Sequence, residues 1–62
     1  MCLATVYKAQ DPDSILLSYV SKLEVEGNTI TLTDVMGETK VVEGTIKMVD
    51  LANSTVEINC LD

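Results

Sequence analysis

The residue with the clearest capacity for metal chemistry is Cys2, in a 62-residue chain that contains no histidine. If Met1 is retained, its amine, the Cys2 amide nitrogen and the Cys2 thiolate can form two fused five-membered chelate rings. If Met1 is removed, the new Cys2 amine and the thiolate form one ring. Mixed nitrogen and sulfur ligands in a plane suit Ni(II) or Cu(II), whereas tetrahedral sulfur sites suit zinc. Two copies of the chain that placed their Cys2 residues near a common axis would supply four such ligands to one ion.

Each cysteine also has a purely structural interpretation. Cys2 could be a small, half-buried side chain at the start of a strand, and residue chemistry alone favours this interpretation. Cys60 shares its alternation phase with Val56 and Ile58, which indicates a core residue. A Cys2–Cys60 disulfide would require the first and last strands to pair, and the reducing cytoplasm argues against it.

Catalytic apparatus is missing from the sequence. Without histidine the chain lacks the commonest general base, and no serine or cysteine has a neighbouring base to activate it. No glycine-rich loop follows a strand to bind phosphate. The carboxylates fall on outward strand positions or in turns, where they form a solvated acidic surface. We therefore expect no enzyme activity, no catalytic residues and no organic cofactor site.

The charge balance argues against nucleic acid as a partner. Four lysines face ten carboxylates, which gives a net charge of −6, whereas nucleic-acid binding draws on cations that neutralise phosphates. Two tyrosines are the only aromatic residues, so platforms for base stacking are also lacking. The sequence shows no secretory signal pattern and no apolar run of the ~20 residues that span a bilayer. A cytoplasmic location with reduced thiols is expected.

Strand chemistry dominates the chain, which we expect to form one domain over residues 1–62. β-Branched and leucine residues alternate with polar ones, and turn residues interrupt them at short intervals. The turns are expected at residues 10–14, at Gly27-Asn28, at residues 34–38 and at Asn53-Ser54. The expected strands cover residues 2–9, 15–26, 29–33 and 39–51, with a last strand after Asn53-Ser54.

The apolar phase predicts which side chains face the core. The inward positions are Leu23, Val25, Ile30, Leu32, Val56, Ile58 and Cys60, while Val42, Gly44, Ile46 and Met48 share one face of the long fourth strand. The phase of that strand then slips to Val49 and Leu51, and a phase slip beside a mid-strand glycine indicates a bend or bulge. Met36 is expected in a turn and Met48 as a core filler.

Five to six short strands at hairpin spacing favour an all-β fold, a small closed barrel of antiparallel strands without exposed edges. A chain of this length has thin stability, yet 47% of its residues are hydrophobic. The surplus of apolar side chains predicts packing against a second copy, so a homodimer is expected.

Three segments in order resemble the CooT family, small nickel-binding accessory proteins associated with maturation of carbon monoxide dehydrogenase. They are MCLATV at residues 1–6, VEGNTITLTDVMGE at residues 25–38 and VEGTIKMVDL at residues 42–51. The resemblance implies an SH3-like small β-barrel, a homodimer, Ni(II) bound through Cys2, and a nickel enzyme as client. Cys60 matches no motif residue of the family. Members have also been labelled RNA-binding proteins, which the acidity of this chain does not support.

Two classes of function follow. The first is a nickel carrier or metallochaperone that assists nickel insertion into carbon monoxide dehydrogenase or a similar enzyme, with Cys2 and the Met1 amine as ligands. The second is a metal-independent protein-interaction module that uses exposed strand edges and the apolar surplus. RNA binding ranks behind both. A Cys2→Ser variant discriminates between the first two, because a pure interaction module would tolerate it.

Overall fold

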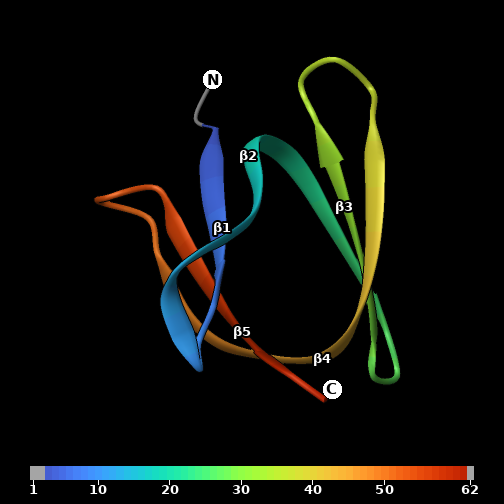
Figure 1. Ribbon diagram of the computed structural model, residues 1–62. Helices are drawn as coiled ribbons and strands as arrows, with labels where there is room; N and C mark the ends of the chain where they lie inside the picture. Colours follow the sequence, from blue (N-terminus) through green and yellow to red (C-terminus); the bar gives the residue numbers. More distant parts are fainter. Residues whose placement is uncertain (1–2, 62) are drawn as a thin grey trace.

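The computed structural model describes residues 3–61, and these residues form five β-strands without a helix (Figure 1). The strands are β1 (Ala4–Lys8), β2 (Asp11–Glu26), β3 (Thr29–Asp34), β4 (Thr39–Asp50) and β5 (Thr55–Cys60). No helix long and apolar enough to cross a membrane occurs in this part of the chain.

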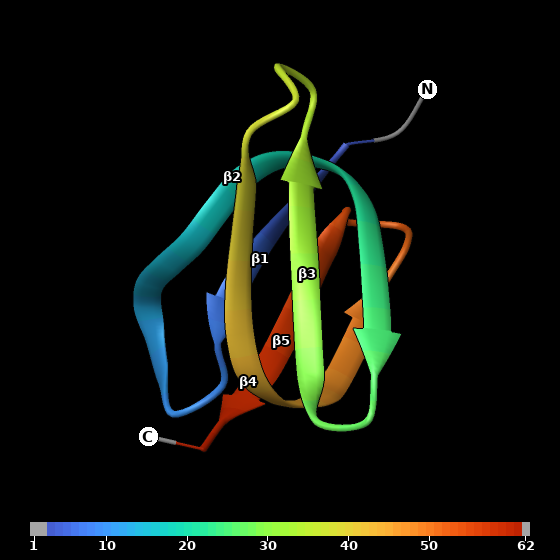
Figure 2. The ribbon, with the colours of Figure 1, turned by 90° about the vertical axis from the view of Figure 1, so that its right-hand side faces the viewer.

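The strands form a closed barrel in the order β1-β2-β3-β4-β5 (Figure 2). Each strand pairs antiparallel with the next along the chain, and β1 closes the ring by pairing in parallel with β5. The closing pair is parallel because, in an alternating series of five strands, the first and last run in the same direction. The predicted small all-β barrel is confirmed, with this one departure from antiparallel pairing.

Two strands are longer than predicted because each bends and pairs with two neighbours. In β2, which has 16 residues, Val20 lies opposite Ala4 of β1 and also opposite Asp34 of β3. The preceding residue, Tyr19, has a φ of 56°, a left-handed conformation that marks the corner. The predicted turn at residues 10–14 is correspondingly shorter, since the turn covers only Ala9 and Gln10 before β2 begins.

The second corner is in β4 at Gly44. Residues 39–43 pair with β3, and from Gly44 onward the strand pairs with β5. The bend predicted at this glycine is confirmed, although the irregularity in strand register lies slightly later, between Ile46 and Met48. The turn at Gly27-Asn28 is also where the sequence predicts it, with a positive φ at Gly27.

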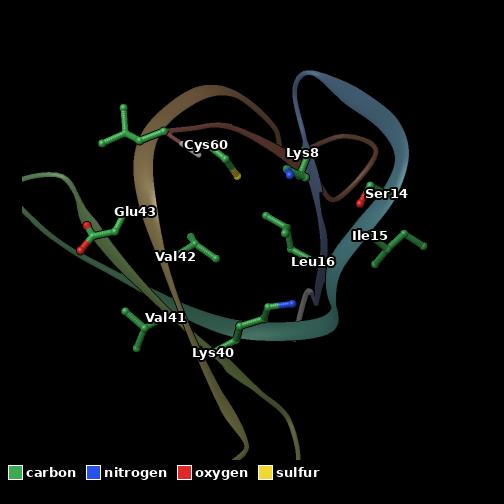
Figure 3. Close-up of a pocket in the computed structure, with 10 residues that line it drawn as sticks. Lys8, Ser14, Ile15, Leu16, Lys40, Val41, Val42, Glu43 and Cys60 are labelled. Carbon is green, nitrogen blue, oxygen red and sulfur yellow. The ribbon is translucent and has the colours of Figure 1, made fainter.

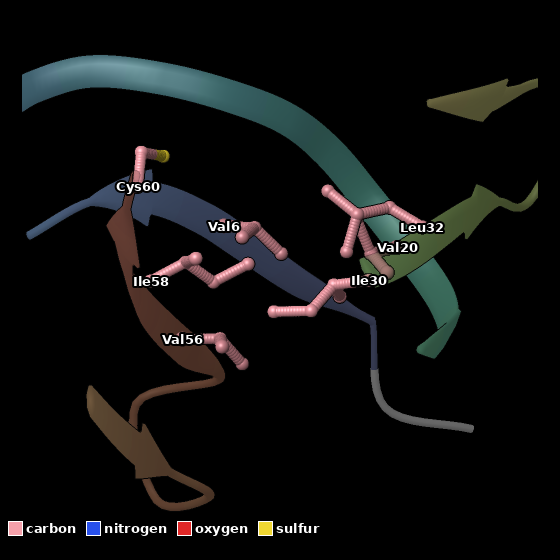
Figure 4. Packing of buried hydrophobic residues seen from close by; sticks show 7 residues of the cluster. All are labelled: Val6, Val20, Ile30, Leu32, Val56, Ile58 and Cys60. Carbon is pink, nitrogen blue, oxygen red and sulfur yellow. The ribbon is translucent and has the colours of Figure 1, made fainter. Parts of the chain in front are cut away.

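The core is a single cluster inside the barrel, to which every strand but β4 contributes a fully enclosed apolar side chain (Figure 4). Its members are Val6, Val20, Ile30, Leu32, Val56, Ile58 and Cys60, with Ala4, Leu16, Leu17, Leu23 and Val42 packed against it. Most of the inward positions predicted from alternation are thus confirmed, including Cys60.

Two predicted core positions are wrong. Val25 lies opposite the buried Ile30 but is 56% exposed, because it is next to the last residue of β2, where the hairpin reaches solvent. Ile46 is 39% exposed, since it follows the corner at Gly44 and precedes the register irregularity in β4. Strict alternation does not hold across such a bend.

Candidate functional site

The predicted metal ligands, Met1 and Cys2, lie outside the described residues. The structure does define where the described chain starts. Ala4, the first residue of β1, pairs with Val20 at the corner of β2, and Thr5 donates its backbone N–H to the carbonyl oxygen of Ser54 at 2.9 Å. The start of β1 is therefore anchored between the corner of β2 and the turn that joins β4 to β5.

The β3–β4 turn lies at the same end of the barrel as the chain start, as both ribbon views show (Figures 1 and 2). The Asp34 carboxylate accepts the backbone N–H groups of Met36 and Glu38, both at 2.9 Å. The backbone N–H of Val35 donates to the carbonyl oxygen of Tyr19 at 2.9 Å, which ties this turn to the corner of β2. The Asp34 carboxylate is therefore already engaged in holding the turn.

The β4–β5 turn engages a second carboxylate. Asp50 accepts a hydrogen bond from the Asn53 side-chain amide at 2.8 Å and another from the Asn53 backbone N–H at 3.1 Å. These bonds, led by the one from the side chain, hold the pKa of Asp50 below its ordinary value because they favour the charged form. The Asp50 carboxylate therefore serves the turn that receives the first residues of β1.

Large apolar side chains are exposed on the segments around this end. They belong to Tyr19 at the corner of β2, to Val35 and Met36 in the β3–β4 turn, and to Leu51 in the β4–β5 turn. The position of Met36 agrees with the prediction that it is a turn residue. Side chains of this kind are available for contact with another protein.

Cys60 lies elsewhere. It ends β5, is 8% exposed and is a free thiol. In the parallel register of β1 and β5, Thr5 lies opposite Thr55 and Lys8 opposite Ile58. Cys60 is therefore beyond the end of β1 and far along the strand from its start. Within residues 3–61, no three histidine, cysteine, aspartate or glutamate side chains gather in a way that could hold a metal ion.

A groove of about 790 Å³ lies between the first part of β2 and the first part of β4 (Figure 3). Leu16, Val42 and Cys60 point into it, and Lys8 and Lys40 lie on either side. The sequence analysis missed this groove. Its walls come from segments more than twenty residues apart along the chain, so no local motif announces it.

Comparison with known proteins gives one positive result. A family model described as "CO dehydrogenase accessory protein CooT" matches residues 1–59. No curated protein and no solved structure matches the chain. The family match covers nearly the full length of the chain, and it includes both the strands that build the barrel and the two residues that precede them.

Proposed function

Since the chain belongs to the CooT family of carbon monoxide dehydrogenase accessory proteins, we propose that it binds nickel through Cys2 and delivers the ion to a nickel enzyme. Family membership carries the accessory role itself. The nickel ligand, the carrier activity and the identity of the client belong to the proposal. Carbon monoxide dehydrogenase is the first client to test.

The observation that carries the proposal is that the family match begins at residue 1 and so includes Cys2. A thiolate beside a chain terminus can combine with backbone or terminal nitrogen to chelate a planar ion. Mixed nitrogen and sulfur ligands of this kind suit Ni(II). The Met1 amine completes the proposed ligand set where Met1 is retained.

The surroundings of the chain start agree with a site for cargo. Strand β1 is anchored from Ala4 onward by pairing with Val20 and by the Thr5–Ser54 hydrogen bond. The carboxylates of Asp34 and Asp50 accept hydrogen bonds within their own turns. Ligands supplied by the chain terminus can be exchanged one after another with those of a client enzyme. The reduced thiol that this exchange needs is expected in the cytoplasm.

A homodimer would complete the coordination. Two Cys2 residues and their nitrogen ligands supply four donor atoms, which satisfies a square-planar ion. The exposed Tyr19, Val35, Met36 and Leu51 provide apolar surface for the contact between the copies or with the client. The proposal therefore predicts one nickel ion for two chains.

Nickel titration of the reduced protein tests the proposal. We expect a thiolate-to-nickel absorption band in the wild-type protein and in Cys60→Ser, and none in Cys2→Ser. Native mass spectrometry of the same samples counts chains and ions and determines whether Met1 is present. Because thiolate coordination releases a proton, nickel affinity should fall as the pH is lowered. A Gly-Ser extension ahead of Met1 should weaken binding if the terminal amine is a ligand.

The outcome that contradicts the proposal is equal nickel binding by wild type and Cys2→Ser, with both proteins folded. A protein that binds no nickel at all, yet associates with carbon monoxide dehydrogenase, would instead be a metal-independent interaction module. Circular dichroism of each variant establishes that the barrel is intact.

A further inference from the structure

We propose that the groove between β2 and β4 binds an extended, acidic peptide segment of a partner protein, which adds a strand to the edge of β4. This is an interaction site distinct from the proposed nickel site, and it does not depend on nickel. Three features of the structure carry it: the pairing of the strands, the apolar floor and the charge of the groove.

The pairing leaves two strand segments with a neighbour on one side only. Residues 39–43 of β4 pair with β3, and pairing with β5 begins at Gly44. The first part of β2 pairs with β1, and its pairing with β3 begins at Val20. These two unpaired edges flank the groove, whose lining includes Ser14 to Leu16 on one side and Lys40 to Glu43 on the other.

The two edges are not equally receptive to an added strand. The β2 edge begins with Asp11, Pro12 and Asp13, and proline and inward or flanking charges are devices that block strand addition. The β4 edge has no proline, and at its centre it carries Val41 and Val42, residues that favour strands. Backbone hydrogen bonds of an added strand would therefore form with β4, while β2 serves as the opposite wall.

The floor of the groove is apolar. Leu16 and Val42 are half-buried and pack against the core cluster, and Cys60 closes the deepest part (Figure 3). In a bound strand, alternate side chains point to the same face. One apolar side chain of the partner can thus rest on Leu16 and Val42, while the residues two positions away on either side reach the rim.

The charge at the rim selects the partner. Two of the four lysines of this acidic chain, Lys8 and Lys40, line the groove. The one carboxylate in its lining, that of Glu43, accepts a hydrogen bond from the Thr29 hydroxyl at 2.9 Å and points away from the groove (Figure 3). Within residues 3–61, neither Lys8 nor Lys40 forms an ion pair; the pair present joins Lys22 and Glu24.

An acidic, apolar strand therefore fits this place, although the rest of the surface repels it. A second copy that presents the same β4 edge fits less well, because strand addition about a two-fold axis brings the two Lys40 side chains near each other. The occupant we assign is accordingly a segment of another protein.

The test uses metal-free Cys2→Ser protein, so that failure of the nickel proposal and failure of this one are distinguishable. The probe is a fluorescein-labelled, seven-residue peptide of alternating glutamate and valine with a central leucine; its control has lysine in place of each glutamate. We expect the acidic peptide to raise fluorescence anisotropy at low salt and the lysine peptide not to. Amide shifts on binding should concentrate in residues 39–43.

Matched variants separate the groove from general charge. Lys40→Glu and Lys47→Glu change the net charge equally, but Lys47 is exposed on β4 outside the groove lining. We expect Lys40→Glu to weaken binding by about tenfold or more, the loss of one close charge pair, and Lys47→Glu to change it little.

Three results would overturn the proposal. The first is an equal effect of Lys40→Glu and Lys47→Glu, and the second is absence of binding at millimolar peptide. The third is a set of amide shifts in residues 39–43 that depend on protein concentration without peptide, which would assign the edge to a second copy.

Discussion

The Gln10 side chain pairs with the backbone of Cys60 as a residue of a neighbouring strand would. Its Nε2 donates to the Cys60 carbonyl oxygen at 2.6 Å, and its Oε1 accepts the Cys60 N–H at 3.2 Å. Strand β1 ends at Lys8, opposite Ile58, so the Gln10 amide continues the pairing of β1 with β5 past the end of β1. A turn residue thereby holds the last position of the closing strand.

Replacement of Gln10 should open this end of the barrel. Gln10→Ala removes both hydrogen bonds to Cys60, and we expect the free energy of unfolding to fall by about 1–3 kcal/mol. Gln10→Glu keeps an oxygen for the Cys60 N–H but loses the donor, so it should also destabilise. Urea unfolding followed by circular dichroism measures both. Wild-type stability of both variants would show that the paired amide contributes nothing.

Gly44 is fixed by the close approach of β4 to β5. A β-carbon at this position would overlap the Asn59 carbonyl oxygen and lie 3.1 Å from the Cys60 α-carbon. Backbone atoms cannot move aside as a flexible side chain can, so Gly44→Ala should cost about 3 kcal/mol, the upper part of the range for overpacking. That is a large share of the stability of a domain this small.

Gly37→Ala is the control for Gly44→Ala. Gly37 has a φ of 88° and open space around its α-carbon, so alanine there meets only the strain of a left-handed backbone, about 1–2 kcal/mol. Urea unfolding of the two variants should therefore rank Gly44→Ala as the more destabilised. The reverse order would contradict the close approach of β4 to β5.

Asp50 gives the fold a pH dependence of known sign. The Asn53 side chain, followed by the Asn53 backbone, lowers the pKa of Asp50 in the folded protein. A lowered folded-state pKa contributes stability that is present above the unfolded-state pKa and is lost as the pH falls through the folded-state pKa. The difference in Tm between wild type and Asp50→Ala should thus be greatest near neutral pH and shrink in acid.

An NMR titration of the Asp50 carboxyl group tests the cause. In Asn53→Ala the leading hydrogen bond is gone, and the pKa of Asp50 should rise toward its ordinary value. The backbone bond from position 53 can remain, so the rise should be partial. An unchanged pKa in Asn53→Ala would mean that the side-chain hydrogen bond is not its cause.

Local pattern predicts the regular parts of this barrel. Ile30 and Leu32 alternate with threonines in β3, and both are fully buried. Strand β3 is straight and paired on both sides, so the two-residue period holds along its whole length. The same pattern fails at Val25 and Ile46, one at the end of a hairpin and the other just after a corner, where burial depends on the path of the sheet.

The corners and the groove depend on contacts between distant segments. The left-handed conformation of Tyr19 is unusual for a residue other than glycine, and nothing in its immediate sequence predicts it. The juxtaposition of Lys8 and Lys40 requires β2 and β4 to approach across the barrel. The candidate nickel site differs from both, because it was predicted from the chemistry of Cys2 and from family resemblance, without any contribution from the fold.

The two cysteines should separate cleanly in experiment. Cys60 is buried among Ile58 and its neighbours in the core, so Cys60→Ala removes apolar contacts and should lower the free energy of unfolding by about 1 kcal/mol. Nickel affinity should not change, because Cys60 is at the far end of β5 from the start of β1. Cys2→Ala should show the opposite pattern, with unaltered urea unfolding and lost nickel binding. Loss of nickel binding in folded Cys60→Ala would show that the buried thiol, and not the chain terminus alone, takes part in the site.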